Sequence, residues 1–176
     1  MNKTETKPYL DLHDHVIQQL AIHDITPSEI GEIVYDLQKD YILQLTPALA
    51  TDAVEHVLAK REVQNAILTG LALDSLANEK LLPEPLQTIV ENDEGLYGID
   101  EQIAMGITSV YGSIGITNYG YLDKVKPQLI GRLNQHKGGR VNTFADDLVG
   151  AIAAAAAARI AHSHPQEVHD NFGIKD

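Results

Sequence analysis

Two pairs of adjacent acidic residues, Asp100–Glu101 and Asp146–Asp147, are the side chains of this sequence best suited to chemistry. Each pair opens a segment that becomes apolar and rich in small residues, so we expect each to begin a helix. The helix dipole there stabilises negative charge by roughly 0.3–1 kcal/mol, and capping alone would explain either pair. If the two helices touch and start at the same end, their carboxylates converge, and their pKa values rise unless a cation lies between them.

A divalent cation is the simplest partner for such a group of carboxylates. Hard oxygen ligands in this number suit Mg²⁺ best and Mn²⁺ next. We therefore predict that Asp100, Glu101, Asp146 and Asp147 hold Mg²⁺, with Mn²⁺ as the alternative ion.

A third cluster, Asp123 and Lys126 followed by Pro127, lies between the two acidic pairs. The two charged residues are one helical turn apart and therefore on one face. A local ion pair, worth a few tenths of a kcal/mol, would explain this spacing equally simply. Beside a metal, Lys126 would instead neutralise the oxygens of a phosphate, and Asp123 would be a further ligand or a base.

The candidate catalytic residues are thus Asp123, Lys126 and Asp147, and the candidate substrate-binding residues are Lys126 and Arg140. Arg140 follows a Gly-Gly pair in the only basic stretch before the second acidic pair. A helix C-cap with basic residues in its last turn explains that stretch equally well.

These motifs follow one another in a recognisable order: Asp100-Glu101, Asp123-x-x-Lys126-Pro127, a Gly-Gly loop, then Asp146-Asp147-Leu-Val-Gly-Ala-Ile. Over about residues 99–161 the sequence resembles the phosphatidylglycerophosphatase A family, and it is most similar to the soluble, Firmicutes-type branch. The resemblance implies a hydrolase of phospholipid biosynthesis that uses Mg²⁺ to convert phosphatidylglycerophosphate to phosphatidylglycerol. The expected substrate is a phosphorylated lipid or a small phosphomonoester.

The sequence departs from the family pattern at several points. Family members usually have an arginine where this chain has Gly120, and their Ala-Gly after the aspartate pair is inverted here to Gly150-Ala151. The Gly-rich N-terminal segment and the membrane-spanning character of the family are missing. An alternative function is therefore a non-catalytic, metal- and phosphate-binding regulatory protein with the family fold, which Gly120 favours. A third is a purely structural helical protein.

Composition restricts the partners and the location. The formal net charge of −12 argues against nucleic acid, whose phosphates need a basic surface. The absence of cysteine excludes disulfides, thiol catalysis and cysteine-based zinc sites. No apolar signal segment is visible at the N-terminus. We expect a cytoplasmic protein that contacts membranes peripherally at most.

The apolar spacing predicts helices only, at about 9–22, 27–43, 47–60, 61–77 and 86–90. The second begins at Thr26-Pro27-Ser28-Glu29, which is a capping box with proline at the first helical position. The fold class expected is all-α, one multi-helix bundle over residues 1–176 with a polar tail after about residue 163. Asp74 ends an apolar run, and solvent exposure at a helix end is favoured over a place in the site.

The segment from Gln102 to Leu122 has no charged residue. Its length would allow a membrane span, but glycines and polar residues dilute it. We predict instead a buried central helix over about 101–117. Small residues recur every four positions in this segment (Ala104, Thr108, Gly112) and again in the last helix (Gly150, Ala154, Ala158), which predicts that the two pack closely. Such seams also favour a homo-oligomer.

Overall fold

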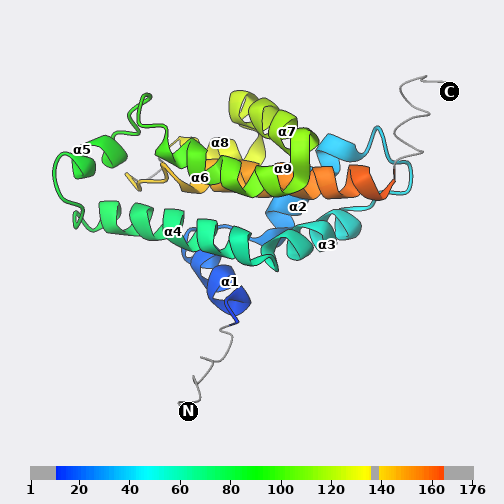
Figure 1. The fold of residues 1–176 in the computed structure, drawn as a ribbon, viewed down its shortest axis with the longest axis horizontal. Coiled ribbons are helices and arrows are strands. Elements are labelled where there is room, and N and C mark those ends of the chain that lie inside the picture. The colour runs from blue at the N-terminus through cyan, green and yellow to red at the C-terminus, as the bar shows by residue number, and fades with distance from the viewer. Residues whose placement is uncertain (1–10, 136–138, 165–176) are drawn as a thin grey trace, which may run out of the picture.

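The computed structural model describes residues 11–135 and 139–164 of the chain. Over these ranges the regular elements are all helical, which confirms the all-α class (Figure 1). In chain order they are α1 (His13–Ile22), α2 (Pro27–Gln38), α3 (Pro47–Leu58), α4 (Arg61–Asn78), α5 (Leu86–Glu91), α6 (Ile99–Thr108), the 3₁₀ turn η1 (Ser109–Tyr111), α7 (Gly112–Val125), α8 (Gln128–Asn134) and α9 (Ala145–Ser163). The polar tail predicted after residue 163 lies almost wholly outside the described residues.

The start of α2 is the predicted capping box. The Thr26 hydroxyl accepts a hydrogen bond from the Glu29 backbone N–H, and the Glu29 carboxylate accepts one from the Thr26 N–H. Pro27 occupies the first turn, where a missing N–H costs nothing. The helix ends earlier than predicted, at Gln38, because the chain turns there and carries Ile42 into the core while Leu43 stays exposed.

The central helix of the bundle is α9, and the prediction of a buried central helix at 101–117 is wrong. Every residue of α9 from Ala145 to Ala158 is buried. Its alanines allow α2, α3, α4, α6, α7 and α8 to pack directly against it. Figure 1 shows α9 running along most of the length of the bundle with the other helices around it.

The uncharged segment is instead split into α6, η1 and α7. The break falls at Gly112, whose φ of +74° belongs to the left-handed region that favours glycine. Only one side of α7 is buried, through Gly115, Tyr119 and Leu122. The lack of charge therefore does not reflect burial on all sides.

The predicted packing of the two small-residue helices is confirmed, because α6 and α7 both contact α9. Ala104 and Thr108 are buried in this seam, whereas Gly112 is exposed and has no part in it. Gly150 lies against the ring of Tyr119, which a Cβ there would meet at 3.6 Å. Among the described residues there is no helix with the length and apolar character needed to cross a membrane.

Candidate functional site

The acidic pairs lie along one hollow of about 140 Å³, to which α6, α7 and α9 contribute. The first turns of α6 and α9 carry the pairs Asp100–Glu101 and Asp146–Asp147, and the end of α7 contributes Asp123 and Lys126. The lining residues are Asp93, Glu94, Gly95, Gly98, Asp100, Glu101, Asp123, Lys126, Thr143, Asp146 and Asp147. Residues far apart in the sequence thus form one acidic surface.

Three of these carboxylates are largely removed from solvent. Asp100, Asp146 and Asp147 are 7%, 3% and 5% exposed, whereas Glu101 is exposed. Burial, together with the charge of Asp146, raises the pKa of Asp147 to about 8. Burial, reinforced by the charges of Glu101 and Asp93, raises the pKa of Asp100 to about 6. The negative charge gathered here is therefore only partly compensated.

The positive charge of Lys126 partly compensates the negative charge of the hollow. Its Nζ atom lies 2.9 Å from Asp146 Oδ2, 3.0 Å from Asp123 Oδ1 and 3.8 Å from Asp147 Oδ1. Burial acts to lower the pKa of Lys126, but the charge and hydrogen bond of Asp146 outweigh it, and the pKa lies above its ordinary value. The ammonium group is thus permanently charged.

The backbone at Lys126 has the unusual conformation that this position needs. Its φ of +47° and ψ of +55° are left-handed, a region that costs a non-glycine residue about 1–3 kcal/mol. Pro127 follows, and a residue before proline is disfavoured in a right-handed helix. The chain therefore leaves α7 at this point, and the lysine side chain lies against the start of α9.

Asp74 of α4 is buried beneath the site, and the prediction that favoured solvent exposure for it is wrong. It is 0% exposed because α4 continues to Asn78 and packs against the start of α9. Its carboxylate accepts hydrogen bonds from the Phe144 N–H, at 3.1 and 3.2 Å for the two oxygens, and from the Ala145 N–H at 2.9 Å. Asp74 therefore satisfies the first N–H groups of the helix that carries Asp146 and Asp147.

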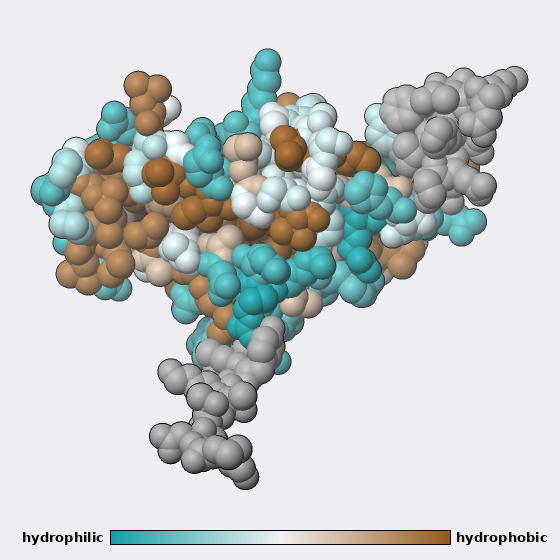
Figure 2. Space-filling model, viewed as in Figure 1, coloured by the Kyte–Doolittle hydropathy of each residue, from teal (hydrophilic) through white to brown (hydrophobic). Residues whose placement is uncertain are grey.

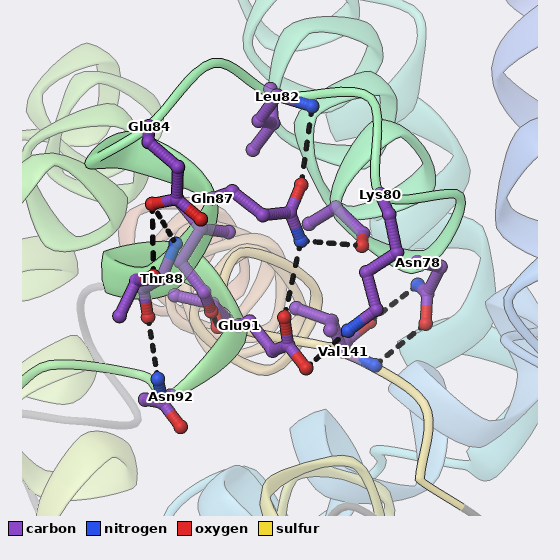
Figure 3. Close-up of polar contacts among 12 residues, drawn as sticks. Asn78, Lys80, Leu82, Glu84, Gln87, Thr88, Glu91, Asn92 and Val141 are labelled. Carbon is purple, nitrogen blue, oxygen red and sulfur yellow. Dashed lines mark hydrogen bonds and ion pairs between the residues drawn. The ribbon is translucent and has the colours of Figure 1, made fainter.

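One helical turn further along α4, Asn78 holds the segment that leads into α9. Its Oδ1 accepts a hydrogen bond from the Val141 N–H at 2.8 Å, and its Nδ2 donates to the Val141 carbonyl at 3.0 Å (Figure 3). The same α4–α5 junction is closed by Gln87, which donates to the Ala77 carbonyl at 2.9 Å (Figure 3). Asp74 and Asn78 together fix the position and the start of α9.

Five lining residues were not predicted as site residues, namely Asp93, Glu94, Gly95, Gly98 and Thr143. Asp93 lies in the turn between α5 and α6, with φ of +48°. Its charge contributes to the raised pKa values of Asp74, Asp100 and Asp146. In the sequence, Asp93 belongs to the turn Asn92-Asp93-Glu94-Gly95. Aspartate is common in turns, so its presence there does not by itself predict a site residue.

Arg140 and Gly120 lie outside the lining of the hollow. The Arg140 Nη1 atom is 2.9 Å from Asp24 Oδ2, on the loop between α1 and α2. Gly120 is exposed on α7, and a Cβ there would have no neighbour within 4 Å. The absence of the family arginine therefore leaves no gap in the described lining of the hollow.

The donors of the hollow fit a hard divalent ion in their chemistry. All are oxygen atoms, and Asp100 Oδ1 is buried without a hydrogen-bond partner among the described residues. No group of three or more histidine, cysteine, aspartate or glutamate side chains in residues 11–135 and 139–164 is already arranged around a common metal position. Ligation by this set would require movement of side chains, since Asp146 now contacts Lys126.

Fold and site together define the class of this protein: it is an all-helical bundle with a buried acidic hollow at one end of its central helix. The chain belongs to the phosphatidylglycerophosphatase A family, whose model matches residues 18–162. It is 58% identical over 159 residues to the uncharacterized protein YutG of Bacillus subtilis (strain 168), which covers 90% of this chain and 96% of YutG.

Solved structures show the same fold. The chain is 51% identical to low temperature requirement C protein from Listeria monocytogenes, with a TM-score of 0.86 and coverage of 89% of this chain and 99% of that one. It is 50% identical to protein ypjQ from Bacillus subtilis, with a TM-score of 0.85 and coverage of 89% and 98%. The family resemblance seen in the motifs is thus confirmed over nearly the whole chain.

Proposed function

We propose that this protein is a Mg²⁺-dependent phosphatase that removes the terminal phosphate of phosphatidylglycerophosphate and releases phosphatidylglycerol. The observation that carries the proposal is the single hollow shared by Asp100, Asp146, Asp147 and Lys126. Family membership supplies the reaction class, which is the hydrolysis of a phosphate monoester.

The residues divide into two groups with different tasks. Asp100, Glu101, Asp146 and Asp147 would hold Mg²⁺, which when bound polarises the phosphoryl group and offsets charge on its oxygens. Lys126, fixed between Asp123 and Asp146, would neutralise the phosphoryl oxygens from the other side. Asp74 positions the second acidic pair and does not contact the substrate.

Asp123 is the group best placed to move a proton. It is partly exposed, unlike the buried acids, and its Oδ1 atom is held by Lys126 at 3.0 Å. In the proposed reaction Asp123 takes one proton of the attacking water as the water oxygen forms a bond to phosphorus, the ester P–O bond breaks, and Asp123 then returns that proton to the leaving oxygen. The products are inorganic phosphate and an alcohol, which for the lipid substrate is phosphatidylglycerol.

The size of the hollow agrees with recognition of the headgroup alone. At about 140 Å³ and lined mainly by polar residues, it has room for a phosphate but none for acyl chains. The lipid chains would remain in the bilayer, and a cytoplasmic protein would act on them from the membrane surface. A small phosphomonoester would enter the same hollow.

A second function, a non-catalytic regulatory protein that binds metal and phosphate, has one specific observation in its favour. Lys126 is the only cation among the described lining residues, and Asp123 and Asp146 already engage it. A site whose single lysine is already paired with two aspartates would bind a metal and a phosphate without stabilising the charge that develops during hydrolysis.

The test is phosphate release from phosphatidylglycerophosphate in mixed micelles and from para-nitrophenyl phosphate, with Mg²⁺ or Mn²⁺. We expect release that EDTA abolishes, and Asp100→Asn and Asp146→Asn should each lower the rate by about a hundredfold. The matched control is Glu79→Gln, an acid-to-amide change at an exposed position of α4's C-cap. Metal binding without release from either substrate would support the regulatory protein and reject the enzyme.

A further inference from the structure

The outer surface of α6, η1 and α7 lacks charge almost entirely. No residue from Gln102 to Leu122 is charged, although charged residues make up 22% of the chain. Several large apolar side chains are nevertheless exposed here, namely Met105, Val110, Ile114, Ile116 and Tyr121. In Figure 2 the surface over α7 is accordingly mostly white and brown, with little teal. This is an unusual face for a molecule of net charge −12.

A groove of about 550 Å³ runs between α7 and the end of α2. Ile114, Asn118 and Tyr121 line one side, and Leu37 and Tyr41 line the other. The Asn118 Nδ2 atom is buried and has no hydrogen-bond partner among the described residues. A buried donor without a partner is costly, so an acceptor supplied from outside this chain would stabilise the groove.

Charged residues lie near the two ends of this face. Asp40 lines the groove beside the first turn of α7, and Lys124 is exposed in the last turn. In the described part of the chain neither forms an ion pair or a side-chain hydrogen bond, whereas Lys39, next to Asp40, pairs with Asp36. Asp36 also lines the groove, but Lys39 and Gln128 engage it, and Asp123 in the last turn of α7 is engaged by Lys126. Asp40 and Lys124 are thus an acid and a cation without such partners at opposite ends of the uncharged part of α7.

We propose that a second copy of this chain covers this face, with the two α7 helices antiparallel across a twofold axis. A twofold interface uses the same patch on both copies, so each contact is made twice. Antiparallel α7 helices place Lys124 of one copy beside the start of α7 in the other, where Asp40 lies. Lys124 of each copy then lies beside Asp40 of the other, so each charge meets one of opposite sign.

The residues between these ends suit a close helix–helix contact. Ser113, Thr117 and Gly120 lie on the side of α7 opposite the buried Gly115, Tyr119 and Leu122, and all three are exposed. Gly120 has no neighbour within 4 Å of a Cβ and no positive φ, so nothing in residues 11–135 and 139–164 requires glycine there. Glycine weakens a helix relative to alanine, and close approach of another backbone would account for it.

Charge favours a second copy over a lipid surface. Anionic membranes attract proteins through clusters of lysine and arginine. The segment 102–122 has neither residue, so this face has no side chain that would attract it to an anionic bilayer. An uncharged face, in contrast, allows two copies of an acidic protein to meet with the least mutual repulsion.

The test is sedimentation equilibrium of the full chain and of charge-reversed variants at low ionic strength. We expect twice the chain mass of 19.2 kDa for the wild type. Lys124→Glu and Asp40→Lys should each weaken dimerisation by about tenfold or more, because each creates two like-charge contacts. The double variant should regain the wild-type affinity. Glu79→Lys makes the same charge change as Asp40→Lys at the exposed C-cap of α4 and should leave dimerisation unchanged.

Gly120→Leu provides an independent check that does not depend on charge. The open space around Gly120 allows the variant to fold, which its helical circular dichroism would verify, but the leucine would separate the two helices. We expect a folded monomer. A wild-type monomer, single variants that dimerise normally, or a double variant without recovery would each overturn the proposal. So would a monomer that floats with phosphatidylglycerol vesicles, since a lipid surface would then cover the face.

Discussion

At the scale of single residues, the site depends on a buried acid that makes no contact with the proposed substrate. Asp74 accepts the N–H groups of Phe144 and Ala145 and so supports the turn that bears Asp146 and Asp147. Capping by aspartate is common at helix starts, but the capping residue usually lies next to the helix in sequence. Here the acceptor comes from α4, 70 residues before Phe144 in the chain, so local sequence rules do not find it.

Removing this acceptor should destabilise the protein. We expect Asp74→Ala to lower the free energy of unfolding by about 2–4 kcal/mol, because it leaves two buried N–H groups without partners. Asp74→Asn keeps an acceptor oxygen and should recover most of this loss. Urea denaturation of the two variants measures the difference. Equal stability of the alanine and asparagine variants would mean that the hydrogen bonds to α9 contribute little.

At the scale of helices, close approach depends on a few glycines, and the structure separates those that packing requires from those that it does not. A Cβ at Gly70 of α4 would lie 2.8 Å from Leu148 Cδ1 and 3.1 Å from Phe144 Cβ. A Cβ at Gly106 of α6 would meet nothing within 4 Å. Both positions are in helix interiors with ordinary backbone conformations, so they form a matched pair.

The same substitution at the two positions should have opposite effects. Gly70→Ala should lower the free energy of unfolding by about 1–3 kcal/mol, because it forces α4 away from the start of α9. Gly106→Ala should raise it by about 0.5–1 kcal/mol, because alanine is the better helix former. Chemical denaturation at one protein concentration gives both values. A stabilising Gly70→Ala would show that α4 and α9 pack less tightly than described.

The elements that the sequence predicts well are those set by local chemistry. Thr26 and Pro27 define the start of α2 through contacts within one turn, and the acidic pairs occupy first turns because the helix dipole favours them there. The choice of central helix failed because burial of a helix depends on its neighbours. Lack of charge predicts burial for the segment 102–122, whereas the helix that is buried along its length is the alanine-rich α9.

At the scale of the whole molecule, the site makes stability depend on pH in an unusual direction. Burial raises the pKa values of Asp74 and Asp147 to about 8 and that of Asp100 to about 6, all above the ordinary value of 3.8. The native state therefore binds more protons than the unfolded state between about pH 4 and pH 8, and stability falls as pH rises through this range. Most proteins lose stability on the acid side, where paired carboxylates become protonated.

We therefore expect the free energy of unfolding, measured in EDTA, to decrease steadily from pH 5.5 to pH 8.5. Mg²⁺ should reverse this loss, because an ion that binds only the native carboxylates stabilises the native state, and more so when those groups are ionised. The shift in melting temperature on adding Mg²⁺ should thus be larger at pH 8.5 than at pH 5.5. Asp147→Asn should reduce both the pH dependence and the Mg²⁺ shift, whereas the exposed control Glu79→Gln should change neither. Stability that rises with pH in EDTA would show that the carboxylates are paired in the native state, and a Mg²⁺ shift independent of pH would place the ion outside the acidic hollow.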